Sequence, residues 1–307
     1  MFSRRSRSSL PGWVGCAPEG AQARLACVEQ RAGQRPAVRW VHTLAFADPT
    51  GALRSLRRSH ALAQRRCVAL LSRGQYQMLP LDAPDVPRED WKAALRWQLK
   101  DLVEFPVDAA SIDLLELPAA AIRGQAKVLA VAAPTAGLRP LAQAAEDAGM
   151  PWQAIDIPET ALRNICALVE TAGRAQALLQ ITAAGAQLVI TLAGDLLLAR
   201  AIDLPGAALA QDDDDARRSA FDRAGLELQR TLDSFERQFS AVTLSRLLLV
   251  PAAGVAGLAD HLRELLYVPV ELLDLADHLD LSEVPELADP ALLGPHLSAI
   301  GAALRES

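Results

Sequence analysis

Strand-forming runs between Ala177 and Gly206 constrain the fold of this 307-residue chain more than any other stretch. Three strands are predicted, at 178–182, 187–192 and 196–204, with turns of small residues between them. A strand, a glycine-containing turn and a second strand present backbone N–H groups to a phosphate in several nucleotide-binding folds. An ordinary hairpin has the same pattern, so the shape alone leaves the function open.

The first part of the chain predicts a similar arrangement. Strands are expected at 13–16, 23–30 and 38–46, with residues 17–20 as the first turn, and a helix follows at 54–66. Residues 67–72 and 76–81 are predicted to pair as a hairpin. Residues 67–151 as a whole are predicted to be an inserted β-β-α-β-β-α subdomain. A strand at 152–157 and a helix at 158–170 lead back to the three-strand stretch.

The segment 88–102 predicts a regular helix, entered through Pro87 and ended before Pro106. Trp97 lies off its apolar stripe, about 120° away at roughly 100° per residue. The acidic residues Asp101 and Glu104 share the face of Trp97. Trp97 is therefore expected either to pack against an adjoining subdomain or to anchor a basic or amphipathic partner peptide.

After Gly206 the pattern changes to a long helix at 211–239 with a regular apolar stripe. Its leading aspartates, Asp212 to Asp215, are explained by capping and the helix dipole better than by a cation site. The remaining predicted elements are a strand at 244–250, a turn at 251–254, a helix at 255–266, a strand at 268–273 and a helix at 291–305.

Charge is unevenly distributed along the chain, whose formal net charge is −6. Residues 1–66 contain twelve Arg against three Asp and Glu, a balance of +9, so the other 241 residues carry −15. A basic segment on an acidic body suits an anionic membrane surface. A general preference for arginine, 28 against three lysines, explains it better. Nucleic-acid binding is not expected, because aromatic residues do not alternate with these arginines.

Other classes of protein lack support in the sequence. No run approaches the roughly eighteen apolar residues of a spanning helix, and no apolar stretch follows the N-terminal arginines as in a signal peptide. The cysteines, Cys16, Cys27, Cys67 and Cys166, are widely spaced and lack metal-ligand motifs, so reduced thiols in a cytosolic protein are expected.

Four short motifs in order give the chain a family resemblance. They are Pro11-Gly12-Trp13-Val14-Gly15, Trp91 to Asp108, Ile155 to Asn164, and Leu228 to Phe235. With these motifs the chain resembles PilM, the cytoplasmic actin-like protein of type IV pilus assembly, and within that family the MshI group of MSHA pilus biogenesis. The resemblance covers nearly the whole chain.

The resemblance implies a duplicated actin-like (ribonuclease H-like) α/β fold with an inserted small α+β subdomain. The first half would be 1–66 with 152–175, the insertion 67–151, and the second half 176–307. The C-terminal helix 291–305 is placed to return to the first half.

In nucleotide-binding members of this fold, three turns hold the phosphates and the adenosine. The matching positions here are Gly15 and Ala17, then Thr182, Ala184 and Gly185, then Gly254. The aspartates that serve Mg²⁺ in the first two turns are missing from this sequence, and Pro18 lacks an N–H. Asp156 matches a family position near the cleft, but one carboxylate does not make a site. The resemblance therefore implies a degenerate nucleotide cleft, with no catalytic residue and no metal ligand.

The implied function is that of a cytoplasmic scaffold at the inner face of the inner membrane. It would dock on the N-terminal cytoplasmic peptide of a PilN-type pilus assembly protein, through Trp97, Asp101, Glu104 and Phe105 as candidate contacts. Peripheral membrane association through the basic N-terminal segment is a further expectation. No cofactor is expected; the alternative is an actin-like ATP-binding protein or ATPase that uses the cleft. An L-type protein of type II secretion shares the fold but normally continues into a membrane helix, which is not expected after Ser307.

Overall fold

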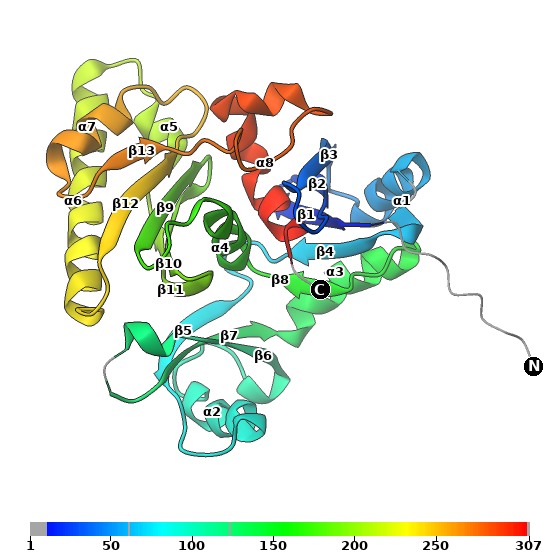
Figure 1. The fold of residues 1–307 in the computed structure, drawn as a ribbon. Helices are drawn as coiled ribbons and strands as arrows, with labels where there is room; N and C mark the ends of the chain where they lie inside the picture. Colours follow the sequence, from blue (N-terminus) through cyan, green and yellow to red (C-terminus); the bar gives the residue numbers. More distant parts are fainter. Residues whose placement is uncertain (1–10, 61, 123, 306–307) are drawn as a thin grey trace, which may run out of the picture.

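The fold is built on two five-stranded sheets of the same strand order, with a three-stranded sheet projecting below their junction (Figure 1). The computed structural model describes residues 11–60, 62–122 and 124–305. The arginines of residues 1–10, on which part of the membrane expectation rests, lie outside the described residues.

The first large sheet has the order β3-β2-β1-β4-β8. The meander β1–β2–β3 is antiparallel, and β4 and β8 continue the sheet in parallel. The strands are β1 (Trp13–Glu19), β2 (Gln22–Glu29), β3 (Ala37–Ala45), β4 (Arg66–Leu70) and β8 (Ala154–Asp156).

The second large sheet repeats this plan in the order β11-β10-β9-β12-β13. An antiparallel meander again comes first, and two parallel strands follow it. The strands are β9 (Ala175–Thr182), β10 (Gly185–Leu192), β11 (Asp195–Ile202), β12 (Leu244–Val250) and β13 (Val270–Leu272). The two meanders predicted from the sequence are thus both present.

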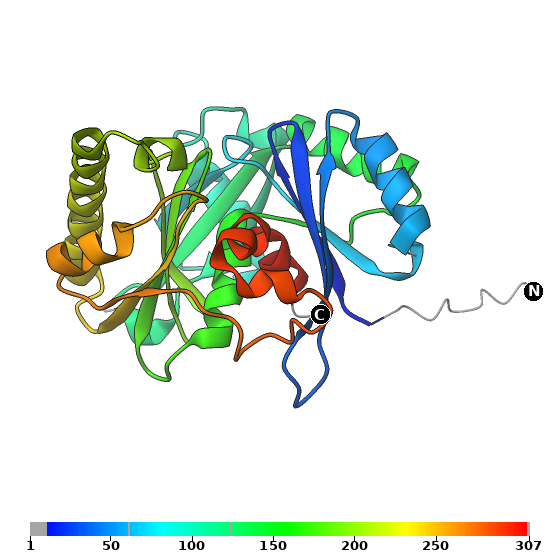
Figure 2. The same cartoon turned by 90° about the horizontal axis from the view of Figure 1, so that it is seen from above.

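Helices cover the outer faces of both sheets (Figures 1 and 2). Helices α1 (Pro49–His60) and α3 (Thr135–Asp147) lie on the outside of the first sheet, and α6 (Asp214–Gln238) and α7 (Leu258–Leu265) on the outside of the second. The apolar stripe predicted for the long helix is the buried face of α6, from Ala220 to Phe235. Asp213 caps that helix, since its Oδ1 accepts the Ala216 N–H at 2.7 Å. The acidic run therefore acts at the helix N-terminus as predicted.

Two helices cross between the sheets and join the halves. Helix α4 (Pro158–Val169) leaves the first sheet and packs on β10 and β11 of the second, whereas α8 (Pro290–Ala303) leaves the second and packs on β1, β2 and β4 of the first. They cross where Gly301 of α8 meets the backbone of Ala161 in α4, and Asn164 Nδ2 donates to the Gly301 carbonyl at 2.9 Å. One continuous apolar core therefore runs through both halves.

The inserted subdomain is smaller than predicted. The expected hairpin of 67–72 with 76–81 does not form, because β4 pairs with β1 and β8 inside the first sheet. The buried run Cys67–Leu70 suits a central parallel strand, which is covered on both faces. Helix α3 likewise packs on α1 of the first half. The projecting unit is the sheet β5-β7-β6 with α2 and short 3₁₀ turns; its elements are β5 (Gln77–Asp82), α2 (Trp91–Leu99), β6 (Ala110–Glu116) and β7 (Lys127–Pro134).

Candidate functional site

The first expected phosphate turn is displaced along the chain. Strand β1 continues through Ala17 to Glu19 because these residues still pair with β2, and the chain reverses at Gly20, where φ is +60°. The turn predicted at 17–20 is corrected accordingly. Gly15 and Ala17 lie within the strand, opposite Ala26 and Arg24.

Gly15 instead lies where α8 packs closely against β1. A Cβ at this position would clash with the carbonyl oxygen of Ala299 and come 3.0 Å from the Cβ of Ala302. Only glycine allows the helix backbone to approach the strand this closely. The signal for Gly15 in the sequence is therefore explained by helix packing in this structure.

The second turn lies between β9 and β10, as predicted. The hydroxyl of Thr182 accepts the Ala184 N–H and donates to the Gly185 carbonyl, both at 3.2 Å. Gly185 has φ +135°, a conformation that side chains disfavour. The turn keeps the geometry of a glycine turn, but the Ala184 N–H is already paired within it.

An arginine from the first half reaches this turn. Arg73 lies in the 72–75 turn after β4, and its Nη2 donates to Gln187 Oε1 on β10 at 3.1 Å. Its Nη1 lies 3.0 Å from where a Cβ of Gly185 would stand. The neighbouring Ser72 donates to the Pro18 carbonyl of β1 at 3.1 Å. The 72–75 turn thus contacts the ends of both meanders, and a guanidinium stands beside Gly185.

Two carboxyl groups lie near this turn. Asp156 is fully engaged: its Oδ2 pairs with Arg305 at 2.5 Å, and its Oδ1 accepts from Thr160 and from the Ile157 N–H. Glu159 is only 6% exposed and accepts from the Tyr76 hydroxyl at 2.6 Å. Burial raises the pKa of Glu159, an effect that the hydrogen bond from Tyr76 and the charge of Arg73 oppose. Burial, and next the charge of Glu159, raise the pKa of Tyr76.

The third turn follows β12 and lies beside the second. A Cβ on Gly206 would stand 2.6 Å from the Cβ of Ala252 and 3.3 Å from the Thr182 carbonyl oxygen, so the second and third turns meet there. Gly254 is exposed, with φ +80°, and faces Ala210. Methyl groups therefore line the approach to this turn.

The described ranges contain no group of three or more His, Cys, Asp or Glu residues placed to hold a metal ion. Across the same ranges, no helix has the length and apolar character needed to span a membrane. All four cysteines are buried and unbonded. Burial raises the pKa of the Cys27 thiol to about 11, so this cysteine is unreactive at neutral pH.

The candidate partner contacts lie on the inserted unit. Trp97 is 76% exposed on α2, so it does not pack against an adjoining subdomain. Helix α2 ends at Leu99, short of the predicted Leu102. Asp101 and Glu104 are therefore exposed in the turn after the helix, and Phe105 is half-buried there. The prediction that these residues share one helical face is therefore wrong, because they lie at the end of a helix and in the turn that follows it.

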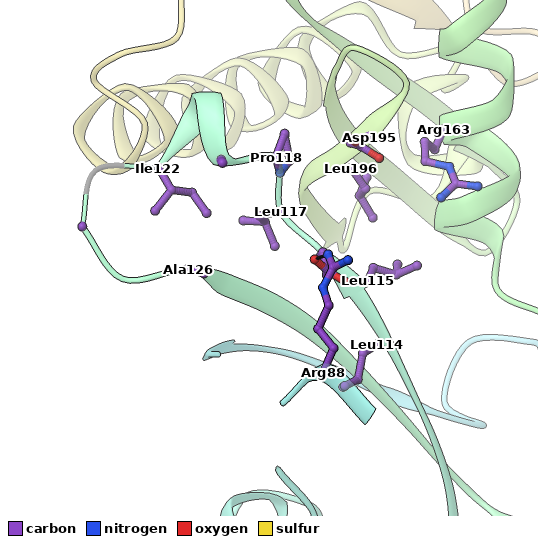
Figure 3. Close-up of a pocket in the computed structure, with 13 residues that line it drawn as sticks. Arg88, Leu114, Leu115, Leu117, Pro118, Ile122, Ala126, Arg163, Asp195 and Leu196 are labelled. Carbon is purple, nitrogen blue, oxygen red and sulfur yellow. Dashed lines mark hydrogen bonds and ion pairs between the residues drawn. The ribbon is translucent and has the colours of Figure 1, made fainter. Parts of the chain in front are cut away.

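A groove of about 600 Å³ opens between the inserted unit and the crossing region (Figure 3). One wall consists of leucines of β6, Arg88, and Pro118, Ala119, Ile122, Gly124 and Ala126 of the following loop. Arg163 of α4 and the start of β11, at Asp195 and Leu196, form the other wall. The β6 strand is an edge of its sheet. The groove thus combines apolar side chains, a free strand edge and charges of both signs.

Comparisons with known proteins find similarity in structure rather than in sequence. No protein-family model matches the chain, and no curated protein does. PilM in the PilM–PilN type IV pilus biogenesis complex is similar over 96% of this chain and 98% of that chain, with 22% identity and a TM-score of 0.74. The cytoplasmic domain of EpsL, an inner membrane component of the Vibrio cholerae type II secretion system, covers 96% of both chains with 14% identity and a TM-score of 0.52.

A third solved structure names the fold. A Bacteroides thetaiotaomicron protein of unknown function with an actin-like ATPase fold matches 94% of this chain and 99% of its own, with 10% identity and a TM-score of 0.52. The chain has an actin-like fold. The predicted fold class is confirmed, and the repeated sheets and crossing helices are the two halves of that fold.

Sequence reasoning missed three residues at this junction, namely Arg73, Tyr76 and Glu159. The sequence marks two of them weakly: Glu159 belongs to the motif Ile155 to Asn164, and Arg73 lies in the turn predicted between 67–72 and 76–81. Their proximity depends on β4 joining the first sheet, which the predicted hairpin had excluded.

Proposed function

We propose that this chain is a scaffold protein of a type IV pilus assembly complex, of the MSHA type, located at the cytoplasmic face of the inner membrane. Its junction between halves is a degenerate nucleotide site. Two observations support the assignment: the fold is shared with PilM over nearly the whole chain, and the sequence contains the four family-like motifs in order.

The arginine beside Gly185 is the observation that carries the degenerate-site proposal. Where a nucleotide-binding relative would place phosphate oxygens, Arg73 lies beside Gly185 and donates a hydrogen bond to Gln187. Asp156, which matches the family position, already pairs with Arg305 and accepts a hydrogen bond from Thr160. Glu159 is buried and accepts from the Tyr76 hydroxyl. With both carboxyl groups engaged in this way, a bound nucleotide would have no carboxylate to place Mg²⁺ for hydrolysis.

Calorimetric titration with ATP at millimolar concentration, with and without Mg²⁺, tests this proposal. No binding heat is expected for the wild-type chain. Weak binding that appears only in Arg73→Ala would show that the guanidinium fills the phosphate position. Micromolar, Mg²⁺-dependent binding by the wild type would favour the alternative of an ATP-binding protein or ATPase.

The partner we propose is the N-terminal cytoplasmic peptide of a PilN-type inner-membrane protein, docked on the inserted unit through Trp97, Asp101, Glu104 and Phe105. An exposed tryptophan beside carboxylates suits a basic or amphipathic peptide, because large aromatic side chains are frequent interface anchors. The solved complex of PilM with PilN supports this class of partner.

Fluorescence titration with the partner peptide measures the docking. Trp97→Ala and Asp101→Lys are each expected to weaken binding by about tenfold or more. Tyr267→Ala removes an aromatic residue, 52% exposed, from the second half and should leave the affinity unchanged. Loss of binding in Arg88→Glu, with Trp97→Ala unaffected, would contradict this placement and move the peptide into the groove of Figure 3.

A further inference from the structure

A pocket of about 390 Å³ lies at the end of the first sheet where β2 turns into β3. Arg31, Arg66 and Arg305 line it together with Gly12, Trp13 and Gln34, and its lining within the described ranges includes no carboxylate. The charged groups of this lining are all guanidiniums, although that of Arg305 also pairs with Asp156 at 2.5 Å. Such a lining favours an anion, and phosphate oxygens suit the planar donor array of arginine best.

The surroundings of this pocket are also rich in arginine. A second hollow, of about 340 Å³, shares Arg31 with the pocket and adds Arg35 and Arg39, with the carboxylates of Glu29 and Asp280 also in its lining. The buried Glu29 serves three guanidiniums, those of Arg39, Arg65 and Arg31, at 2.8, 3.4 and 3.6 Å. Arg39 also pairs with Glu283, so two carboxylates serve these three guanidiniums, and one positive charge remains in excess. We call Arg31, Arg35, Arg39, Arg66 and Arg305 the arginine face; Arg65 does not belong to it, because its side chain is only 13% exposed.

The pocket contains two features of a built site. Arg66 lies over the indole ring of Trp13, with its Cζ 4.6 Å from the ring centroid, which fixes the guanidinium on a buried aromatic base. The Nε1–H of Trp13 is buried and has no hydrogen-bond acceptor among the described residues. Arg31 also lines the pocket, and its side chain is 58% exposed. The pocket therefore presents fixed and adjustable donors together.

The place of the arginine face in the molecule points to an extended anionic surface. The β2–β3 hairpin, the start of the described chain and the C-terminal end lie on one side (Figure 2). Residues 1–66 carry +9, whereas residues 176–307, with nine Arg and twenty Asp and Glu, carry −11. Such a charge dipole orients the first half toward a negative surface.

We propose that the arginine face docks on an anionic phospholipid membrane, with a headgroup phosphate in the pocket of Arg31, Arg66 and Arg305. The inference goes beyond the scaffold function because it assigns a lipid-binding surface. It uses no property of the pilus partner, so failure of peptide docking would leave it standing. The surface also lies apart from Trp97 on the inserted unit, which allows the two activities to be measured separately.

Co-sedimentation of the full chain with vesicles tests the proposal. Binding is expected to vesicles of phosphatidylcholine with 30% phosphatidylglycerol, to weaken as salt is raised, and to be lacking with phosphatidylcholine alone. The double variant R31E/R35E is expected to lose about thirtyfold or more in affinity. The control R218E/R223E changes the net charge equally on α6 of the second half and should bind as the wild type does.

Two variants that each remove one positive charge distinguish phosphate binding in the pocket from general electrostatic attraction to the membrane. Arg66→Gln is expected to lower vesicle affinity about fivefold, whereas Arg58→Gln on α1, which removes the same charge from the same half, should not. Circular dichroism confirms that both variants are folded. If a variant and its control lost vesicle affinity equally, in either of the two comparisons, the arginine face would not be the membrane-binding surface. Saturable binding of inorganic phosphate without vesicle binding would overturn the membrane assignment, as would binding of a nucleic-acid duplex but not of anionic vesicles.

Discussion

The two large sheets share one topology, but different residues hold the crossing helix α8 against each of them. Counted back from their hairpin turns, Glu19 of β1 corresponds to Thr182 of β9, and Ala17 corresponds to Gln180. Gln180 binds α8 with its side chain: Nε2 donates to the Gly294 carbonyl at 3.0 Å, and Oε1 accepts from Ser298 at 3.1 Å. Strand β1 offers the bare backbone of Gly15 instead. The duplicated topology fixes the path of the chain, whereas local contacts decide how each half is joined.

The largest expected effect comes from breaking the contact between the crossing helices. Gly301→Ala places a methyl group against the Ala161 backbone and should lower the free energy of unfolding by about 3 kcal/mol. Gly137→Ala is the matched control: this helical glycine has nothing within 4 Å of an added Cβ, and the change should raise stability by about 0.5 kcal/mol. Urea unfolding measures both. Shifts of the same sign would show that close packing does not set the helix crossing.

The next effect concerns acid and the first-half face of α8. Burial, with the charges of Arg24 and His42, lowers the pKa of His296 to about 4. The unfolded chain, where histidine titrates near about 6.5, binds the proton first. Stability should therefore be fully present above about pH 6.5 and be lost as the pH falls toward 4.

In His296→Gln the free energy of unfolding should fall less over this pH range, by on the order of 1–2 kcal/mol. The expected difference is this small because the ring of His296 is only partly buried. Unfolding curves between pH 8 and 4 measure it, with pH 8 as the reference. An unchanged pH dependence in the variant would assign the acid sensitivity to other groups.

A smaller effect is expected where the halves meet through Arg73. Arg73→Ala removes the hydrogen bond to Gln187, and because Arg73 is exposed the loss of stability should be about 1 kcal/mol. Amide hydrogen exchange at 183–187 should become faster. Arg174→Ala, an exposed arginine in the loop before β9, is the control. Equal exchange rates in the two variants would mean that Arg73 does not join the halves.

The smallest effect tests the turn between β10 and β11, where the second meander is tighter than the first. Ala193 has φ +54°, and it is the sole non-glycine residue with positive φ in the described part of the chain. Ala193→Asn creates the Asn-Gly pair favoured in such hairpins and should raise stability by about 0.5 kcal/mol. Thermal unfolding measures the shift. A destabilised variant would mean that the methyl group of Ala193 makes contacts worth more than the backbone strain.

Much of the fold was predictable because its signals are local. The two meanders, the stripe of α6 and the cap at Asp213 follow from strand alternation, helical spacing and an acidic helix start. The pairing of β4 was not predictable, because a short buried run between turns suits a hairpin and a central parallel strand equally. That one error displaced the boundary of the inserted unit and hid the approach of Arg73 to Gly185.

The candidate site divides in the same way. The sequence by itself determined which groups are missing, since the loss of an aspartate or the presence of Pro18 needs no coordinates. It also determined the excess of arginine in the first 66 residues. Only the tertiary structure decided what the remaining groups contact: Gly15 meets α8, Asp156 meets Arg305, and Arg31, Arg66 and Arg305 surround one pocket. Gly12 and Arg305, 293 positions apart, share that pocket because α8 crosses back to the first sheet, and no local pattern encodes such a return.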